Sequence, residues 1–249
     1  MSKSFKILKS KKKPTKQLPK FMEAVKWIGI ANPVLQPSEE TGEMFSTERK
    51  ILGTGFYIKN KPYIVTCHHV ISPFLKDTEA EAGEILSGVR SSIREVLLVG
   101  SAYGFNTASV VGVDMKHDIA ILEEHVDKER RKKHANAFGF KFGKEFPNVG
   151  ERVAYAGYPM GDALCYENHH ATYAEGAIGS VPRSTPDLNK IQITGPTTGG
   201  YSGGPLFSRY NQETLYGMVY EQPSERGASD AAIFYAVGAN HVHNLLNCF

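Results

Sequence analysis

Short runs of apolar and β-branched residues recur along most of the chain, and turn residues separate them. The runs lie at 53–58, 63–67, 96–103, 109–114, 119–122, 152–157, 177–181, 190–194, 215–220 and 232–237. Gly, Pro, Asn and Asp stand at the joints between them. Many short strands bounded in this way are typical of antiparallel barrels and not of alternating helix and strand units. The predicted fold class is therefore all-β.

Several segments depart from this pattern. Residues 21–30 are compatible with a short helix or a strand. Residues 77–94 are compatible with a helix, and the charged segment 127–137 is interpreted as a surface loop or a short helix between two halves of the chain. Residues 239–246 have the composition of a closing helix. At 249 residues, the chain is long enough for one large β domain or for two small barrels that share an interface.

Charge is concentrated at the N-terminus. The chain has 29 Lys and Arg against 26 Asp and Glu, a net charge of only +3. Eight lysines fall within the first twenty residues, from Lys3 to Lys20, and no acidic residue accompanies them. Such a segment repels itself and buries little apolar surface, so residues 1–20 are predicted to be a disordered tail. The tail is either a solvated extension or a tether for an anionic partner, a nucleic acid or a membrane surface.

The cysteines and the hydropathy bear on location. Cys67, Cys165 and Cys248 are odd in number, which disfavours a disulfide framework and favours a reducing compartment. No apolar run resembles the core of a signal peptide, and none approaches the ~20 residues that span a bilayer. These observations predict a cytoplasmic protein.

The segment 199–205, Gly-Gly-Tyr-Ser-Gly-Gly-Pro, carries the most informative chemistry. Glycines on both sides of Ser202 permit a tight turn and a close approach of substrate backbone. The N–H groups of Gly200 and Ser202 are then placed to stabilise an oxyanion while Ser202 Oγ attacks. The alternative is a glycine-rich turn with an incidental serine.

A serine hydroxyl needs a base, and a histidine base needs a carboxylate to orient it. His68 and His69 follow an apolar run, and Asp118 opens another. Taken singly, such a histidine is often structural and such an aspartate often belongs to a turn. A metal site formed by Cys67, His68, His69 and His117 is disfavoured because adjacent histidines on a strand point to opposite faces. No metal and no cofactor is predicted.

Together, segments 63–70, 118–122 and 200–206 resemble, in that order, the histidine, aspartate and serine motifs of the trypsin-like serine peptidases. The likeness is closest to the HtrA branch, whose motifs are similar to residues 53–56, 110–114 and 150–154. It covers roughly residues 27–246 and leaves no room for a PDZ domain.

The resemblance implies two six-stranded antiparallel barrels with the active site in the cleft between them and a short C-terminal helix. It implies a peptidase domain at 21–249, with a first barrel at about 21–130, a second at about 138–238 and a helix at 239–246. Alignment with the histidine motif selects His69 over His68.

The same resemblance bears on activation and specificity. Tyr201 stands where secreted trypsins have the aspartate that pairs with a newly cut N-terminus, so the serine loop must be held by other contacts. Pro196 and Thr197 are expected at the base of the primary pocket. Met218, Val219 and Tyr220 are expected to form one wall of it. Without a carboxylate at the base, Lys or Arg in the pocket would be buried unpaired, so a small or medium apolar residue is predicted there.

The predicted function is an intracellular serine endopeptidase that acts on proteins or peptides, with Ser202 as nucleophile, His69 as base and Asp118 as the orienting group. Two alternatives remain open from the sequence. One is a binding module with the peptidase fold and a latent cleft. The other is tethering of nucleic acid through the lysine-rich tail.

Overall fold

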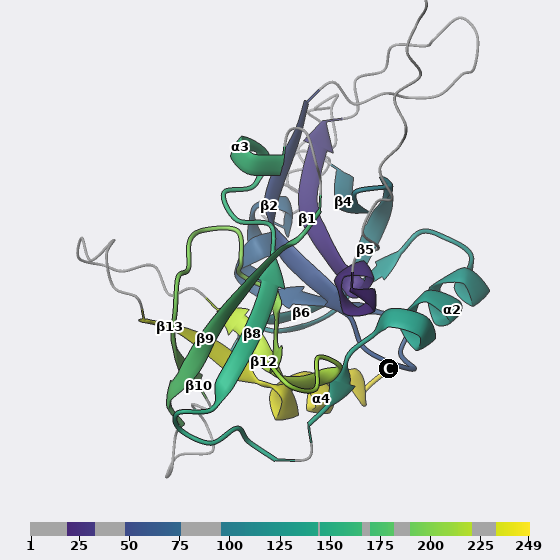
Figure 1. The fold of residues 1–249 in the computed structure, drawn as a ribbon. Helices are drawn as coiled ribbons and strands as arrows, with labels where there is room; N and C mark the ends of the chain where they lie inside the picture. Colours follow the sequence, from purple (N-terminus) through teal and green to yellow (C-terminus); the bar gives the residue numbers. More distant parts are fainter. Residues whose placement is uncertain are drawn as a thin grey trace, which may run out of the picture.

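The computed structural model describes residues 19–32, 48–75, 96–143, 145–165, 170–181, 190–220 and 233–249. Almost all of the predicted tail and the helix-compatible segment 77–94 lie outside these ranges. The described residues form two β-barrels that lie side by side (Figure 1). The all-β, two-barrel prediction is confirmed.

The first barrel contains six strands and is closed in the order β1-β2-β3-β6-β5-β4. Its strands are β1 (Val25–Asn32), β2 (Glu48–Tyr57), β3 (Ile64–Cys67), β4 (Val96–Ser101), β5 (Gly104–Asp114) and β6 (Ile119–Glu124). Every pairing in it is antiparallel. The ambiguous segment 21–30 resolves into a short 3-10 helix, η1 (Lys20–Ala24), followed by β1.

The second barrel follows the order β11-β8-β9-β10-β13-β12 and closes through pairing of β11 with β12. Its strands are β8 (Arg152–Gly157), β9 (Thr172–Ser180), β10 (Lys190–Thr194), β11 (Pro205–Ser208), β12 (Thr214–Tyr220) and β13 (Ile233–Gly238). A two-residue strand, β7 (Lys141–Phe142), pairs in parallel with the outer side of β12.

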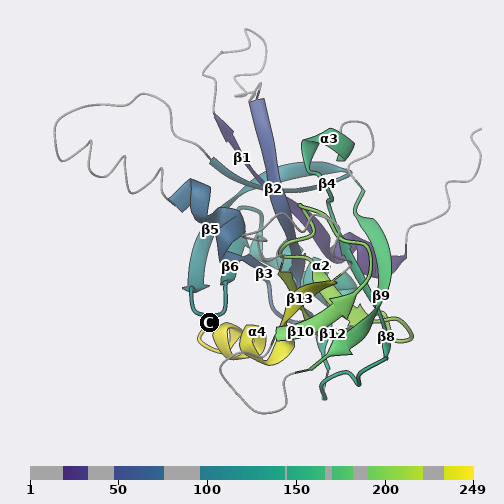
Figure 2. The same ribbon diagram turned by 90° about the vertical axis from the view of Figure 1, so that its left-hand side faces the viewer.

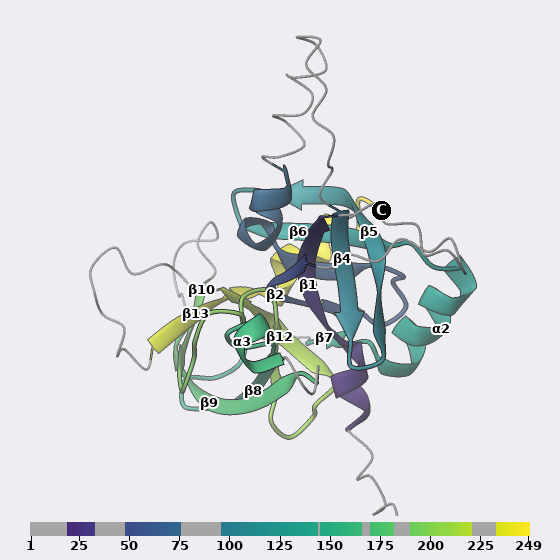
Figure 3. The ribbon, with the colours of Figure 1, turned by 90° about the horizontal axis from the view of Figure 1, so that it is seen from above.

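Helices complete the frame. The charged segment after β6 forms α2 (Lys128–Phe138). Asp127 caps its N-terminus, where the Asp127 side chain accepts a hydrogen bond from the N–H of Arg130. This helix lies at the outer side of the first barrel, next to β4 and β5 (Figure 3). A single turn, α3 (Asp162–Cys165), follows β8, and the predicted closing helix is α4 (Ala239–Leu246). No helix in these ranges is long and apolar enough to cross a membrane.

The two barrels share a packed interface. Phe56 of the first barrel meets Phe140 edge-on at 5.7 Å between ring centroids, and Phe140 in turn meets Phe207 of the second barrel at 5.2 Å. All three rings are completely buried. The C-terminal helix contacts β12 and β13 and also β5 (Figure 2). Burial of these aromatic side chains fixes one barrel against the other and so positions the residues at their junction.

Two local predictions differ from the structure. Residues 68–75, which include both histidines, are helical and do not continue the strand, because β3 ends at Cys67. The argument against a metal site from opposite strand faces therefore used the wrong local geometry. The short strand β11, directly after the serine segment, was not predicted, because its glycine and proline neighbours are turn residues in sequence.

Candidate functional site

Strand register brings Asp118 to His69. Cys67, the last residue of β3, pairs with Ile119, the first residue of β6, so the residues beyond these two strand ends are neighbours. The main-chain carbonyl of Asp118 accepts a hydrogen bond from the N–H of His68 at 3.0 Å. The two segments therefore meet through main-chain as well as side-chain contacts.

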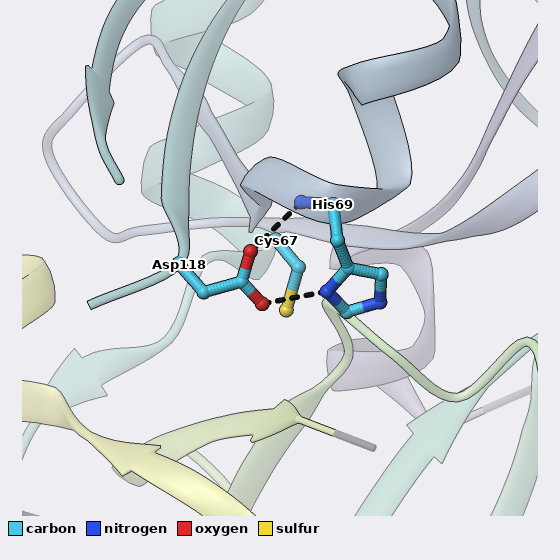
Figure 4. Close-up of side chains that lie close together, drawn as sticks. All are labelled: Cys67, His69 and Asp118. Atoms are coloured by element: carbon cyan, nitrogen blue, oxygen red, sulfur yellow. Dashed lines mark hydrogen bonds and ion pairs between the residues drawn. The ribbon is translucent and has the colours of Figure 1, made fainter. Parts of the chain in front are cut away.

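The carboxylate of Asp118 holds His69 at two points. Oδ2 accepts a hydrogen bond from the imidazole Nδ1 at 2.6 Å, and Oδ1 accepts one from the main-chain N–H of His69 at 2.8 Å (Figure 4). Because a carboxylate can only accept, Nδ1 carries the proton and Nε2 of the neutral ring is left as an acceptor. This tautomer is the one that a general base needs.

Asp118 adopts an uncommon backbone conformation, with φ of 56°. A non-glycine residue in the left-handed region costs about 1–2 kcal/mol. Three hydrogen bonds, two through the side chain and one through the carbonyl, hold it there. Strain kept in place by such contacts is characteristic of functional positions.

The serine loop lies directly against the histidine strand. The N–H of Thr54 in β2 donates to the carbonyl of Ser202 at 2.9 Å, and the N–H of Gly203 donates to the carbonyl of Val219 at 2.9 Å. A Cβ on Gly203 would lie 3.1 Å from the main-chain nitrogen of Cys67. The structure thus brings the loop of Ser202, from the second barrel, beside the end of β3, two residues before His69.

Ser202 is buried, with 5% of its surface exposed. Among the described residues, no hydrogen bond joins its Oγ to His69. In ligand-free enzymes, the catalytic hydrogen bonds are often long and tighten when substrate binds.

Two main-chain donors in this loop have no acceptor among the described residues. These are the N–H groups of Gly200 and Ser202, whereas those of Tyr201, Gly203 and Gly204 all donate to carbonyls. Gly200 has φ of +101°, and a Cβ there would lie 2.2 Å from the carbonyl oxygen of Tyr158, so only glycine fits. Two unengaged main-chain donors in the same short loop can bind an anionic oxygen.

A model of the trypsin-like peptidase domain matches residues 53–218. The chain belongs to the trypsin-like peptidase domain family. The matched span begins within β2, ends within β12 and includes all three residues of the predicted triad.

Individual relatives agree with this family. The chain is 31% identical over 177 residues to a DegP-like periplasmic serine endoprotease of Pseudomonas fluorescens, covering 70% of this chain and 30% of the relative. A DegP-like protein of Halomonas elongata is 32% identical over 167 residues, 66% of this chain and 28% of the relative. The chain therefore spans about 30% of the length of these relatives.

Solved structures share the fold. A serine endoprotease from Yersinia pestis superposes with a TM-score of 0.58 at 19% identity, covering 92% of this chain and 63% of that one. The active form of a protease from M. tuberculosis gives 0.56 at 20% identity, covering 91% of this chain and 81% of that one.

The prediction of a cytoplasmic location is wrong. The DegP-like relatives from Pseudomonas and Halomonas are named as periplasmic proteins. Cysteine count was a poor guide to compartment, because Cys67 is completely buried as a free thiol inside the fold.

Cys67 lies beside His69 and Asp118 in the candidate site. Its sulfur lies within 4.8 Å of the ligand atoms of His69 and Asp118, a grouping that could in principle hold a metal ion. Burial and the adjacent Asp118 charge raise the pKa of this thiol well above its usual value. The protonated thiol instead donates to the carbonyl of Val219 at 3.4 Å.

The residues predicted to form the specificity pocket do not all share one environment. Val219 packs in the second-barrel core with Tyr155 and Tyr201, whereas its neighbour Met218 packs in the other core cluster, which extends into the first barrel. Alternate strand residues face opposite sides, so the side chain of Met218 is turned away from that of Val219. The ring of Tyr220 meets that of His69 edge-on at 5.9 Å.

At the predicted pocket base, the carbonyl of Pro196 accepts a hydrogen bond from the hydroxyl of Tyr155. The hydroxyl oxygen of Thr197 is buried and has no partner among the described residues. Neither Pro196 nor Thr197 carries a charge.

Tyr201 supplies contacts in place of the missing aspartate of secreted trypsins. It is 5% exposed, and its ring meets Tyr155 edge-on at 5.3 Å. Because Tyr155 also bonds Pro196, the two tyrosines connect both ends of the segment that leads to Ser202. Aromatic packing therefore contributes to holding this loop.

Sequence reasoning missed the role of Thr54. Its buried hydroxyl donates to the carbonyl of Gly200 at 2.6 Å and accepts from the N–H of Tyr158 at 3.0 Å. One first-barrel side chain thus fastens two second-barrel loops. The available indication was a small hydroxyl residue between Gly53 and Gly55, in a segment otherwise noted only for its family likeness.

Proposed function

We propose that this chain is a serine endopeptidase that hydrolyses peptide bonds through an acyl-enzyme on Ser202. The observation that carries the proposal is the double hydrogen bond from His69 to the carboxylate of Asp118, next to a serine loop that is fastened to the same barrel. Membership of the trypsin-like peptidase family supports it independently.

In the proposed mechanism, His69 Nε2 takes the proton of Ser202 Oγ as this oxygen attacks the peptide carbonyl carbon. Asp118 holds the ring in the required tautomer and stabilises the imidazolium that forms. The N–H groups of Gly200 and Ser202 bind the oxyanion of the tetrahedral intermediate. The imidazolium then gives its proton to the leaving amine. Water attacks the acyl-enzyme by the same steps and restores the free hydroxyl.

Protein or peptide substrates with a small or medium apolar residue before the cleaved bond fit this proposal. The base formed by Pro196 and Thr197 offers no carboxylate for a basic side chain. Cleavage-site profiling in a proteome-derived peptide library tests this part. A preference for Lys, Arg, Asp or Glu at that position would contradict it.

A fluorophosphonate probe tests the proposed activity without knowledge of the natural substrate. Wild-type protein at neutral pH should be labelled, and peptide mapping should find the adduct on Ser202. Ser202→Ala should abolish labelling, while Ser180→Ala, which alters an exposed serine on β9, should leave it unchanged. Folded wild-type protein that resists the probe would instead indicate a latent binding module.

A further inference from the structure

A cavity lies at the end of the first barrel that is far from His69. Its volume is about 340 Å³, and its walls include Lys26, Tyr57, Asn106, Glu124 and residues of α2. Asp118 directly precedes strand β6, and Glu124 is its last residue. Six residues of strand span about 20 Å, so the two residues lie at opposite ends of the strand. The cavity is therefore a separate site at the mouth of the barrel, a common position for ligand pockets.

Lys26 is the unusual residue of this cavity. It is only 7% exposed, and its side chain forms no hydrogen bond or ion pair with any residue that the structure describes. Burial lowers the pKa of its ammonium group, while the charges of Glu124 and Glu23 act in the opposite direction. Lysine is seldom buried without a partner, because removing its charge from water is costly.

The nearby carboxylate of Glu124 is already engaged. One oxygen accepts from the hydroxyl of Tyr57, and the other accepts from the amide of Asn106 at 2.7 Å. The main-chain carbonyl of the same residue accepts from Arg131 Nη1 at 2.7 Å. Each oxygen of the Glu124 carboxylate therefore already has one hydrogen-bond donor.

Unused donors in the cavity are instead cationic. The exposed side chain of Arg130 has no hydrogen-bond or ion-pair partner in the described part of the chain, and its charge acts on Lys26. Nε of Arg131 is buried without a partner among the described residues. The cavity lining holds three cationic side chains, Lys26, Arg130 and Arg131, against two carboxylates, Glu23 and Glu124, and this balance favours an anion over a cation.

Aromatic side chains supply an apolar part of the lining. Tyr103, Phe105 and Phe138 all line the cavity. Tyr103 is 75% exposed and Phe105 is 49% exposed, so large ring surfaces face solvent there. A flat apolar ligand would cover rings that are otherwise exposed to water.

We propose that this barrel mouth binds a small organic anion, an aromatic carboxylate, whose carboxylate pairs with Lys26 and Arg130 and whose ring lies against Tyr103 and Phe105. The volume is within the range of pockets for small molecules. The site is independent of the proposed peptidase chemistry, because none of its residues belongs to the His69, Asp118 and Ser202 group.

Calorimetric titration with phenylacetate and its neutral counterpart phenylacetamide tests this site in the full chain. Phenylacetate should bind at least tenfold more tightly than phenylacetamide. Lys26→Met, which keeps the length of the side chain and removes its charge, should abolish that preference. Lys133→Met, an exposed change on the same helix as Arg130, should retain it. Amide shifts in nuclear magnetic resonance spectra should map phenylacetate to residues 100–106 and 124–131.

Arg130→Gln provides a second test that does not depend on replacing a buried residue, and it should weaken phenylacetate several-fold. Failure of phenylacetate to bind, equal affinity for acid and amide, or an unchanged preference in both Lys26→Met and Arg130→Gln would overturn the proposal. Binding is read directly, so an inactive peptidase site would not affect the result.

Discussion

Replacing Gly203 with alanine probes the contact between the serine loop and the histidine strand. Gly203 has φ of +85°, and an added Cβ would lie 2.1 Å from the carbonyl oxygen of Thr54, 2.5 Å from Oγ1 of Thr66 and 3.1 Å from the nitrogen of Cys67. Two of these three atoms are main chain in the first barrel, so relief requires the loop to move by about 1 Å. Gly150 is a matched control, because its φ is +84° and a Cβ there would meet nothing within 4 Å.

The two variants share the backbone strain of about 1–2 kcal/mol. Overpacking adds a further ~3 kcal/mol at Gly203 alone. Gly203→Ala should therefore melt about 6–12 °C below Gly150→Ala, as measured by calorimetry. It should also react much more slowly with a fluorophosphonate because Ser202 is displaced. Equal melting temperatures and equal labelling rates in the two variants would refute the close packing argued here.

Two further predictions concern the frame around the site. Thr54→Val should lower the free energy of unfolding in urea by about 2–4 kcal/mol, because the carbonyl of Gly200 and the N–H of Tyr158 both lose a buried partner. Thr54→Ser keeps the hydroxyl and should lower it much less. Equal losses in the two variants would contradict the role of the hydroxyl. Burial and the charge of Lys26 lower the pKa of His134 from 6.5 to about 4. Between these two pH values the unfolded chain binds a proton at His134 and the folded chain does not, so stability falls as the pH falls from about 6.5 to about 4. Between pH 7 and pH 4.5, the free energy of unfolding should fall by roughly 2 kcal/mol less in His134→Gln than in the wild type. Identical pH profiles of urea unfolding in the two proteins would contradict the lowered pKa of His134.

Much of the fold was predictable from local pattern. Strands such as 152–157 and 190–194 agree with β8 and β10 because their apolar runs are bounded by strong turn residues. The helical turn at 68–75 was not predictable in the same way. Its first residues are held by Asp118, fifty positions away, and not by any local helix preference.

The candidate site was predictable in its residue types and less so in its supports. Ser202, His69 and Asp118 were predicted from the likeness of segments 63–70, 118–122 and 200–206 to the motifs of a known family. The contacts of Thr54 with Gly200 and of Tyr201 with Tyr155 join segments distant in sequence, and no pattern of hydrophobic positions encodes them. Likewise, Lys26 sits inside an apolar strand, and only the closed barrel shows that its charge lies in a cavity.

The most direct measurement of the central claim is a double-mutant cycle on the rate of fluorophosphonate labelling at Ser202. Asp118→Asn should slow labelling by about 10⁴-fold, because an amide has only one oxygen and cannot replace both carboxylate oxygens that accept from the main-chain N–H and the ring Nδ1 of His69. His69→Gln should slow it at least as much, and the double variant should be no slower than His69→Gln, since Asp118 acts only through the histidine. Rates that fall multiplicatively in the double variant, in protein that remains folded, would contradict the assignment of these residues to one catalytic unit.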